Sequence, residues 1–473
     1  MRPTGRAFPT SGSANHRESL HATGVRQRVG GALFLTLAGL GLAARDAITD
    51  AQWIALLWVS ALPLLLALWP NLSPQMPQLN RATLRMVAIF LTVMALCAVQ
   101  LLRIQVVMSD VISHRVGVDP ETGAVVSNPL LADAALRVPR GSILDRNGVV
   151  LAESVTEGGV FERRYFTPDT ADVTGYFSPL LYGATGLEAS WDDELMGDAG
   201  GNPFWQALQT LRGLPPQGND LHLTLDVTLQ QEAHAALGSR PGAVVLLDVQ
   251  TGAVLTLASN PTFDANALTA LTDEDRAAAQ AAWNTLTTDP RTPLVQRATS
   301  GLYAPGSTFK TVTASAALQR GIADADTVYE DAGSITINGH TLVEANRPDD
   351  SVTEWTLRDA FSWSLNVVFA QVGLQLGGPA LADAARSWGW ESVIPFDLPS
   401  EPSRVSVTPG FLDNELAVAE TAFGQGELLV TPLQMALVAA GVANEGEVMR
   451  PYLVQSITEP DGETLRTVSP ETW

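Results

Sequence analysis

The chain has 473 residues and a formal net charge of −22 at pH 7, a length that allows two to four domains. Residues 1–107 carry +6 and residues 108–473 carry −28, so the acidic body lacks the basic surface that nucleic acid binding requires, and no nucleic acid partner is expected. A single cysteine excludes an internal disulfide and a cysteine-based zinc site, the six histidines never fall at metal-ligand spacing, and neither a metal nor a cofactor is predicted.

Three apolar runs lie near the N-terminus, after a basic leader over residues 1–28. They cover residues 29–44, 53–69 and 86–107, and each is close to the ~20 residues that cross a bilayer. Tryptophans at both ends of the second run suit a membrane interface. We therefore predict a membrane region over 29–107 with three spans. Two alternatives stay open: a single span, or a cleaved signal peptide, which would account for only one run.

The placement of arginines orients these spans. The leader holds five arginines, and the link between the second and third runs holds Arg81 and Arg85. Because positively charged loops stay in the cytoplasm, we expect the leader and this link there, which leaves the acidic body on the other side of the membrane. One span and three spans give the same orientation.

The acidic body is expected to begin with a loop-rich α+β module over residues 108–235. Within it, Asn147-Gly148 between apolar residues predicts a β-hairpin. Asp226 is placed to cap the helix that follows it. Residues 242–259 then suit two strands joined by a turn.

Helices are predicted in the rest of the chain, over residues 273–287, 307–319, 357–376 and 380–388. One more follows Thr431, which can act as the N-cap. Pro432 takes the first helical position, and Gln434 can complete a capping box. No internal repeat or low-complexity tract is found.

Lys310 is the only lysine of the chain, against 27 arginines. Chance is one explanation, since the composition strongly favours arginine. The other is chemical: a buried lysine can lose its proton, whereas arginine cannot. Lys310 stands three residues after Ser307 in "PGSTFK". On a helix the two side chains share a face, so a neutral lysine can take the proton of the serine hydroxyl, and the Ser307 N–H can hold one side of an oxyanion.

A second polar pair follows in "AFSWSLNVVFAQ", where Ser364 and Asn366 form an S-x-N pattern. A second serine can relay a proton, and an asparagine amide can hold a peptide bond of a substrate. Alone, this pattern is most simply an ordinary helix segment. Its distance from Ser307 and Lys310, about fifty residues, makes the functional interpretation the better one.

These motifs make the chain resemble a class B penicillin-binding protein, a membrane-anchored D,D-transpeptidase of peptidoglycan, whose superfamily carries S-x-x-K, an S-x-N type motif and K-T-G. The likeness extends from about Arg137 to the C-terminus. It is carried by the segments "RGSILDRNGVVLAES", "GAVVLLDVQTGAVLTLASNPTFDAN", "RATSGLYAPGSTFK" and "AFGQGELLVTPLQMALVAAGVANEG".

The resemblance implies an α+β fold in two parts after the membrane helices. Residues 108–235 would form a non-catalytic pedestal, similar to a dimerisation module. Residues 236–473 would form a transpeptidase domain, with an antiparallel sheet covered by helices on both faces and an all-helical subdomain.

The resemblance also implies roles for single residues. Ser307 would attack the D-Ala-D-Ala bond of a stem peptide, Lys310 would be the base, Ser364 would relay protons and Asn366 would bind the donor. β-Lactams would acylate the same serine. A membrane glycosyltransferase is the implied partner. The segment Gly424, Gln425 and Gly426 is expected near the cleft, although a turn before a helix explains it almost as well.

The K-T-G motif of the family does not occur, since the 473 residues contain no second lysine. We therefore expect the C-terminal strands to be missing, as in a fragment of an active enzyme, and the transpeptidase activity of the printed chain to be doubtful. A catalytically incompetent membrane scaffold and a continuation encoded elsewhere stay open as alternatives. Three other classes of protein fit less well. A β-lactam sensor would need a cytoplasmic domain larger than residues 1–28, and a secreted β-lactamase would lack the anchor and residues 108–235. A purely structural protein would leave the placement of Lys310 unexplained.

Overall fold

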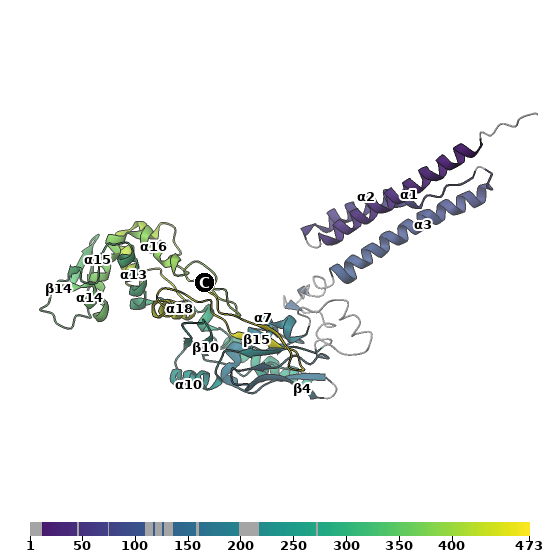
Figure 1. The fold of residues 1–473 in the computed structure, drawn as a ribbon. Coiled ribbons are helices and arrows are strands. Elements are labelled where there is room, and N and C mark those ends of the chain that lie inside the picture. Colours follow the sequence, from purple (N-terminus) through teal and green to yellow (C-terminus); the bar gives the residue numbers. More distant parts are fainter. Residues whose placement is uncertain are drawn as a thin grey trace, which may run out of the picture. The chain divides into compact units, whose positions relative to one another are not determined.

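The computed structural model describes residues 12–44, 47–73, 75–108, 117–118, 125–126, 136–157, 160–197, 217–270 and 273–473. The chain divides into two compact units, Met1–Leu131 and Ala132–Trp473 (Figure 1).

Long helices dominate the first unit. They are α1 (Gly12–Ala43), α2 (Asp50–Leu68) and α3 (Gln78–Leu102), which η2 (Arg103–Val107) extends, and the short strands β1 (Gly117–Val118) and β2 (Val125–Val126) pair antiparallel after them. Phe34 and Ala38 of α1 pack on Leu64 of α2, with Leu96 and Val99 of α3 against them. The three helices therefore lie side by side (Figure 1).

Two of these helices have the length and composition of membrane spans. Among the described residues, α2 and the continuous segment Gln78–Val107 pass this test. The apolar part of α1 is shorter, because Arg26 and Arg28 interrupt it on the N-terminal side. Large apolar side chains such as those of Leu35 and Trp58 are exposed on these helices, as they would be if lipid covered them. The number of spans stays a prediction.

The main sheet of the second unit has six strands in the order β16-β15-β8-β3-β4-β5. Their bounds are β3 (Ile143–Leu144), β4 (Val150–Glu157), β5 (Val160–Tyr165), β8 (Asp220–Leu223), β15 (Val454–Thr458) and β16 (Thr464–Thr467). Only the β3–β8 pair is parallel among these neighbours. Because β15 pairs with β8, the predicted ranges 108–235 and 236–473 share this sheet.

Local chemistry explains the elements that the sequence predicted here. Gly148 adopts a φ of +81° in the turn between β3 and β4, and the Asp145 carboxylate accepts hydrogen bonds from the N–H groups of Asn147 and Val149. The predicted hairpin is thus confirmed. Asp226 caps α10 (Val227–Leu237) by accepting from the N–H groups of its first turn.

A second, two-stranded antiparallel sheet is formed by β9 (Gly242–Leu247) and β10 (Val254–Asn260), as predicted. The helices α10, α12 (Arg297–Ser300) and α18 (Pro432–Ala443) contact this sheet. Thr431 caps α18, but Gln434 does not complete a capping box. Its side-chain amide instead donates to the Trp388 carbonyl at 2.7 Å, because the start of α18 is buried against other elements.

The helices α13 to α17 share one apolar core. They are α13 (Lys310–Gln319), α14 (Leu357–Trp363), α15 (Asn366–Leu376), α16 (Gly378–Ser387) and α17 (Glu415–Ala422). Figure 1 shows α13, α14, α15 and α16 grouped together. The prediction of a single helix over residues 357–376 is wrong. Helix α14 ends before Ser364, which adopts the left-handed conformation, and α15 begins two residues after Ser364. The mixed α+β fold is as expected.

The remaining elements are short apart from one helix, α11. They are η3 (Pro168–Thr170), α6 (Ala171–Thr174), β6 (Phe177–Ser178), β7 (Gly183–Ala184), α7 (Gly186–Ser190), α8 (Asp192–Leu195), η4 (Ala265–Leu268), α11 (Asp273–Thr288), η5 (Gly306–Phe309), β11 (Val328–Glu330), β12 (Ser334–Ile337), β13 (His340–Val343), β14 (Glu354–Thr356) and η6 (Phe411–Asp413).

Candidate active site

Ser307 and Lys310 lie on the 3₁₀ turn η5 and at the start of α13, which follows it directly. Phe309 anchors this segment, because its ring is fully buried and meets the Trp390 ring edge-on at 5.5 Å. The turn leaves Ser307 exposed and carries Lys310 inward, where the residue is only 1% exposed. The predicted helix over 307–319 thus begins as a 3₁₀ turn.

The Lys310 amine binds the S-x-N segment through three hydrogen bonds. Nζ donates to the Ser364 carbonyl at 2.6 Å, to the Ser364 hydroxyl at 3.0 Å and to the Asn366 side-chain oxygen at 2.8 Å. The Phe369 ring lies below the amine, 5.4 Å from its centroid. The Lys310 amine therefore brings three predicted site residues together, although Ser364 and Asn366 lie more than fifty residues after the lysine in the sequence.

The break between α14 and α15 makes this meeting possible. Ser364 ends α14 with φ 59° and ψ 44°, and Leu365 is extended. The side chain of Leu365 is fully buried in the helical core, which fixes the break in place. A continuous helix would use the Ser364 carbonyl in its own hydrogen-bond ladder, whereas the break frees this carbonyl for the lysine.

Burial lowers the pKa of Lys310 to about 8, and attraction to the Glu344 carboxylate opposes this shift. An ordinary lysine has a pKa near 10.4 and is almost wholly protonated at neutral pH. With a pKa near 8, a useful fraction of Lys310 is a neutral amine. A neutral amine is the form that can accept a proton, as S-x-x-K chemistry would require.

Two residues that the sequence did not single out also bind this segment. The buried Glu344 carboxylate accepts the N–H of Val367 at 2.9 Å, in the first turn of α15. The Asn346 side chain donates to the Ser364 carbonyl at 3.0 Å. Both residues follow β13 in an irregular stretch, and no motif or spacing in the sequence marks them.

Gly424 lies beside the turn η5, which carries Ser307. The Gly306 N–H donates to the Gly424 carbonyl at 2.9 Å. Gly424 has a φ of +87°, and a Cβ added there would come within 1.7 Å of the Gly306 carbonyl oxygen, so only glycine fits. Gln425 is exposed, and Gly426 has a φ of +71°. Among the described contacts, neither of these two touches the Lys310 cluster.

The hydroxyl of Ser307 makes no hydrogen bond within the part of the chain that the structure describes, and none to Lys310. The two side chains share a short turn, but the lysine amine is bound to Ser364 and Asn366 instead. Ser307 is therefore exposed to solvent and not tied to a described neighbour through its hydroxyl. Among the described residues, no group of three or more His, Cys, Asp or Glu side chains is placed to hold a metal ion.

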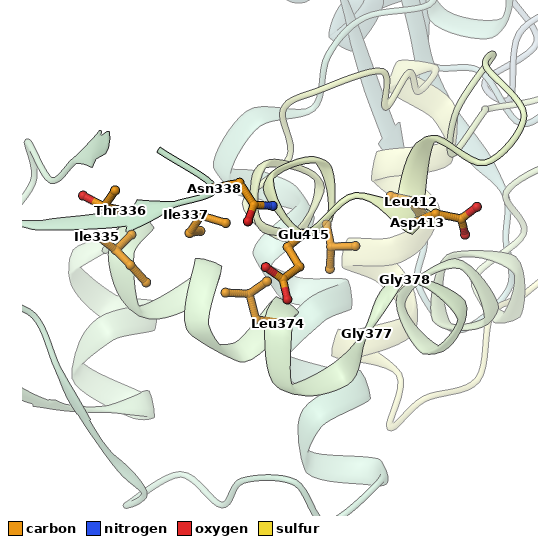
Figure 2. A pocket seen from close by; sticks show the side chains of 11 residues that line it. Ile335, Thr336, Ile337, Asn338, Leu374, Gly377, Gly378, Leu412, Asp413 and Glu415 are labelled. Atoms are coloured by element: carbon orange, nitrogen blue, oxygen red, sulfur yellow. The ribbon is translucent and has the colours of Figure 1, made fainter. Parts of the chain in front are cut away.

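A separate pocket of about 480 Å³ lies elsewhere in the helical part (Figure 2). Figure 2 shows Asn338 from the β12–β13 turn, Leu374 from α15 and Glu415 from α17 among its lining side chains. None of the seven predicted site residues lines this pocket.

Comparison with known proteins places the chain in a family. Residues 242–473 match the penicillin binding protein transpeptidase domain, and residues 140–221 match the penicillin binding protein A dimerisation domain. The peptidoglycan D,D-transpeptidase PbpA of Mycolicibacterium smegmatis is 36% identical over 345 residues, which cover 70% of this chain and 68% of the relative. The chain belongs to the penicillin-binding protein transpeptidases.

Other members of this family agree with the assignment. The peptidoglycan D,D-transpeptidase MrdA of Escherichia coli K12 is 30% identical over 305 residues, covering 61% of this chain and 46% of MrdA. The penicillin G acyl-enzyme complex of penicillin-binding protein A from Mycobacterium tuberculosis superposes with a TM-score of 0.64 and 34% identity, covering 71% of this chain and 77% of that one. The family matches lie inside the predicted ranges 108–235 and 236–473, whose boundaries stay predictions.

Proposed function

We propose that this chain is a peptidoglycan D,D-transpeptidase that works through an acyl-enzyme on Ser307. The observation that carries the proposal is the buried Lys310 amine, held by Ser364 and Asn366, three residues after an exposed serine at the start of a helix. The relatives named as peptidoglycan D,D-transpeptidases and the acyl-enzyme structures support the same reaction class.

The first half-reaction forms an ester on Ser307. The neutral Lys310 amine accepts the hydroxyl proton as Oγ attacks the carbonyl carbon of the penultimate D-Ala of a stem peptide. The Ser307 N–H is one donor to the oxyanion. The C–N bond then breaks, and the terminal D-Ala leaves with a proton that Ser364, hydrogen-bonded to the lysine, can deliver.

The second half-reaction reverses the proton path. An amine of a neighbouring stem peptide attacks the ester carbonyl, gives up a proton toward Ser364 and Lys310, and releases Ser307 Oγ, which takes a proton back. The product is a cross-link between two peptides. Asn366 binds the donor peptide, and the Gly424–Gly426 segment borders the cleft beside Gly306. A β-lactam follows the first half-reaction only, because opening its ring leaves the acyl group on Ser307.

The cellular setting is also part of the proposal. Residues 1–28 and the link after α2 lie in the cytoplasm, and the acidic body lies outside, as the arginine distribution favours. A membrane glycosyltransferase that supplies glycan strands is the proposed partner. Although no K-T-G motif occurs among the 473 residues, an incompetent scaffold is the less favoured alternative, because burial lowers the pKa of Lys310 and the relatives compared above are named as transpeptidases.

The orientation is testable because Cys97 is the only cysteine. In a Cys97→Ala background, Ser73→Cys reports on the link after α2 and Asp461→Cys on the acidic body. In intact spheroplasts, a membrane-impermeant maleimide is expected to label position 461 and to spare position 73 until the cells are opened. The reverse pattern would overturn the orientation.

The reaction is tested with a stem pentapeptide that ends in D-Ala-D-Ala and an added D-amino acid as acceptor. We expect release of one D-Ala for each acceptor incorporated, and loss of both in Ser307→Ala. A folded wild-type protein that releases no D-Ala would contradict the transpeptidase proposal.

A further inference from the structure

Glu344 is an acid buried next to the lysine cluster, with only 8% of its surface exposed. One carboxylate oxygen accepts the N–H groups of Ala345 and Asn346 at 2.9 and 3.0 Å. The other accepts the N–H of Val367. A single carboxylate thus fixes both the turn after β13 and the first turn of α15, where negative charge is favourable.

The turn that Glu344 fixes reaches the S-x-N segment itself. Asn346 follows two residues later, and its side chain donates to the Ser364 carbonyl at 3.0 Å. Lys310 donates to the same carbonyl oxygen. The Ser364 carbonyl is therefore held by two donors, the Lys310 amine and the side chain of Asn346, whose backbone N–H binds Glu344.

We propose that Glu344 is a positioning residue of the acylation site. It holds the Ser364–Asn366 segment against Lys310, directly at α15 and through Asn346, and its negative charge attracts the lysine. The inference rests on the proposed function, in which Lys310 is the base. Glu344 does not touch the reacting atoms, so its effect is exerted through Lys310 and Ser364.

The charges around the lysine support this role. The Phe369 ring, which lies on the amine, carries no net charge. Burial raises the pKa of Asp331 and repulsion by Glu344 adds to the rise, whereas a hydrogen bond from the Gly333 N–H opposes it. The nearby Arg347 guanidinium is paired with Asp350 at 3.1 Å. Glu344 is thus the anion that acts on Lys310, and its attraction raises the lysine pKa against the effect of burial.

The single lysine allows a direct measurement. Protein labelled with ¹³C at the lysine ε-carbon and extracted in detergent as the full chain has one lysine signal, whose titration reports the pKa of Lys310. We expect a midpoint of about pH 8 in the wild type. In Glu344→Gln the midpoint should fall by about one unit, the lower end of what a nearby opposite charge contributes.

A matched control is available in Asp397, which is partly buried and accepts two backbone N–H groups, from Leu453 and Val454. Asp397→Asn loses a comparable structural anchor and should leave the lysine midpoint unchanged. Glu344→Asp keeps the charge on a shorter side chain and should keep the midpoint near that of the wild type. Circular dichroism establishes that each variant is folded.

The outcomes separate this inference from the proposed function. A midpoint in Glu344→Gln equal to the wild-type value would overturn the inference, and so would an equal shift in Glu344→Asp or in Asp397→Asn. These titrations do not require any reaction. If the wild type titrates as expected but is not acylated by penicillin G, the proposed function fails while the electrostatic part of the inference holds.

The acylation rate tests the positioning part. Asn346→Ala removes the side-chain bond to the Ser364 carbonyl without removing a charge. We expect penicillin G acylation to slow by roughly threefold to tenfold, the size of one hydrogen bond, with no shift of the lysine midpoint. An unchanged acylation rate in folded Asn346→Ala would show that the turn after β13 does not position the site.

Discussion

At the scale of single residues, the central feature is a lysine that is almost fully buried and bound to three oxygen acceptors. An arginine could fill much of this space and make similar bonds, but it would stay protonated. The sequence already singled out Lys310, because both the rarity of lysine and its spacing from Ser307 can be read from the sequence alone. The environment of Lys310 could not be predicted from the sequence. Only folding brings the lysine close to the residues around it, which are Glu344, Ser364, Asn366 and Phe369.

Replacing Lys310 by arginine tests the need for a neutral amine. We expect Lys310→Arg to lower the rate of acylation by penicillin G by a factor of about 10² to 10⁴, the usual contribution of a general base. Fluorescent penicillin labelling over time measures the rate, and circular dichroism establishes that the variant is folded. A rate close to that of the wild type would mean that Lys310 does not act as a base.

The pH dependence of acylation follows from the same group. If Lys310 is the base, the reactive form is the neutral amine, and burial lowers the pKa of Lys310 to about 8. Below this pH the amine is protonated, so the acylation rate of the wild type should rise with pH up to about 8 and then level off. Stopped-flow acylation across pH 6 to 10 measures the profile. A rate that is flat through this range would argue against a lysine base.

At the scale of elements, the site depends on a helix break that simple patterns miss. The residues from Leu357 to Leu376 all suit a helix, and the sequence predicted one. The structure breaks it at Ser364, since the buried side chain of Leu365 and the bonds to Lys310 outweigh local propensity. By contrast, the Asn147-Gly148 hairpin and the Asp226 cap were predicted correctly, because the residues that form them are neighbours in sequence.

The left-handed conformation of Ser364 gives a way to separate fold from chemistry. Ser364→Gly relieves the cost of a side chain at positive φ but raises the entropy of the unfolded chain, so the free energy of unfolding should change by less than about 1 kcal/mol. The hydroxyl is lost, so acylation should slow by about 10²-fold. Thermal unfolding and penicillin labelling measure the two effects. Equal acylation rates in the variant and the wild type would exclude a proton relay through Ser364.

A buried ionic cluster joins β5 and α7 in the module before the transpeptidase region. Burial alone would raise the pKa of the Glu188 carboxyl, but the Arg163 and Arg140 guanidinium groups outweigh it and hold the pKa below its ordinary value. Both arginines bind this carboxylate, at 2.6 and 2.9 Å. Glu188 is fully buried, so removal of its charge leaves two buried cations with one fewer partner.

We expect Glu188→Gln to lower the free energy of unfolding by about 3 to 5 kcal/mol, the usual cost of breaking a buried ion pair. The readout is the midpoint of thermal unfolding. Asp289→Asn, which breaks the solvent-exposed pair with Arg291, serves as control and should leave the midpoint nearly unchanged. If both variants unfold at the wild-type temperature, the cluster does not stabilise the module.

At the scale of the whole molecule, the chain combines an apolar, basic N-terminal part with an acidic body that carries the site. The net charge is +6 over residues 1–107 and −28 over residues 108–473, and this contrast can be read from the sequence alone. The sequence did not reveal that β15, close to residue 473, pairs with β8 far upstream. Such pairing depends on contacts more than two hundred residues apart, for which the chain contains no local signal.

The claim that unites these scales is that Ser307 is a nucleophile activated by Lys310. The most direct measurement is the intact mass of the purified protein before and after penicillin G, with Ser307→Ala measured in parallel. We predict one covalent adduct per chain, mapped by peptide analysis to the segment containing Ser307, and no adduct in the variant. A folded wild-type protein that gains no mass, or an adduct that persists in Ser307→Ala, would contradict the account.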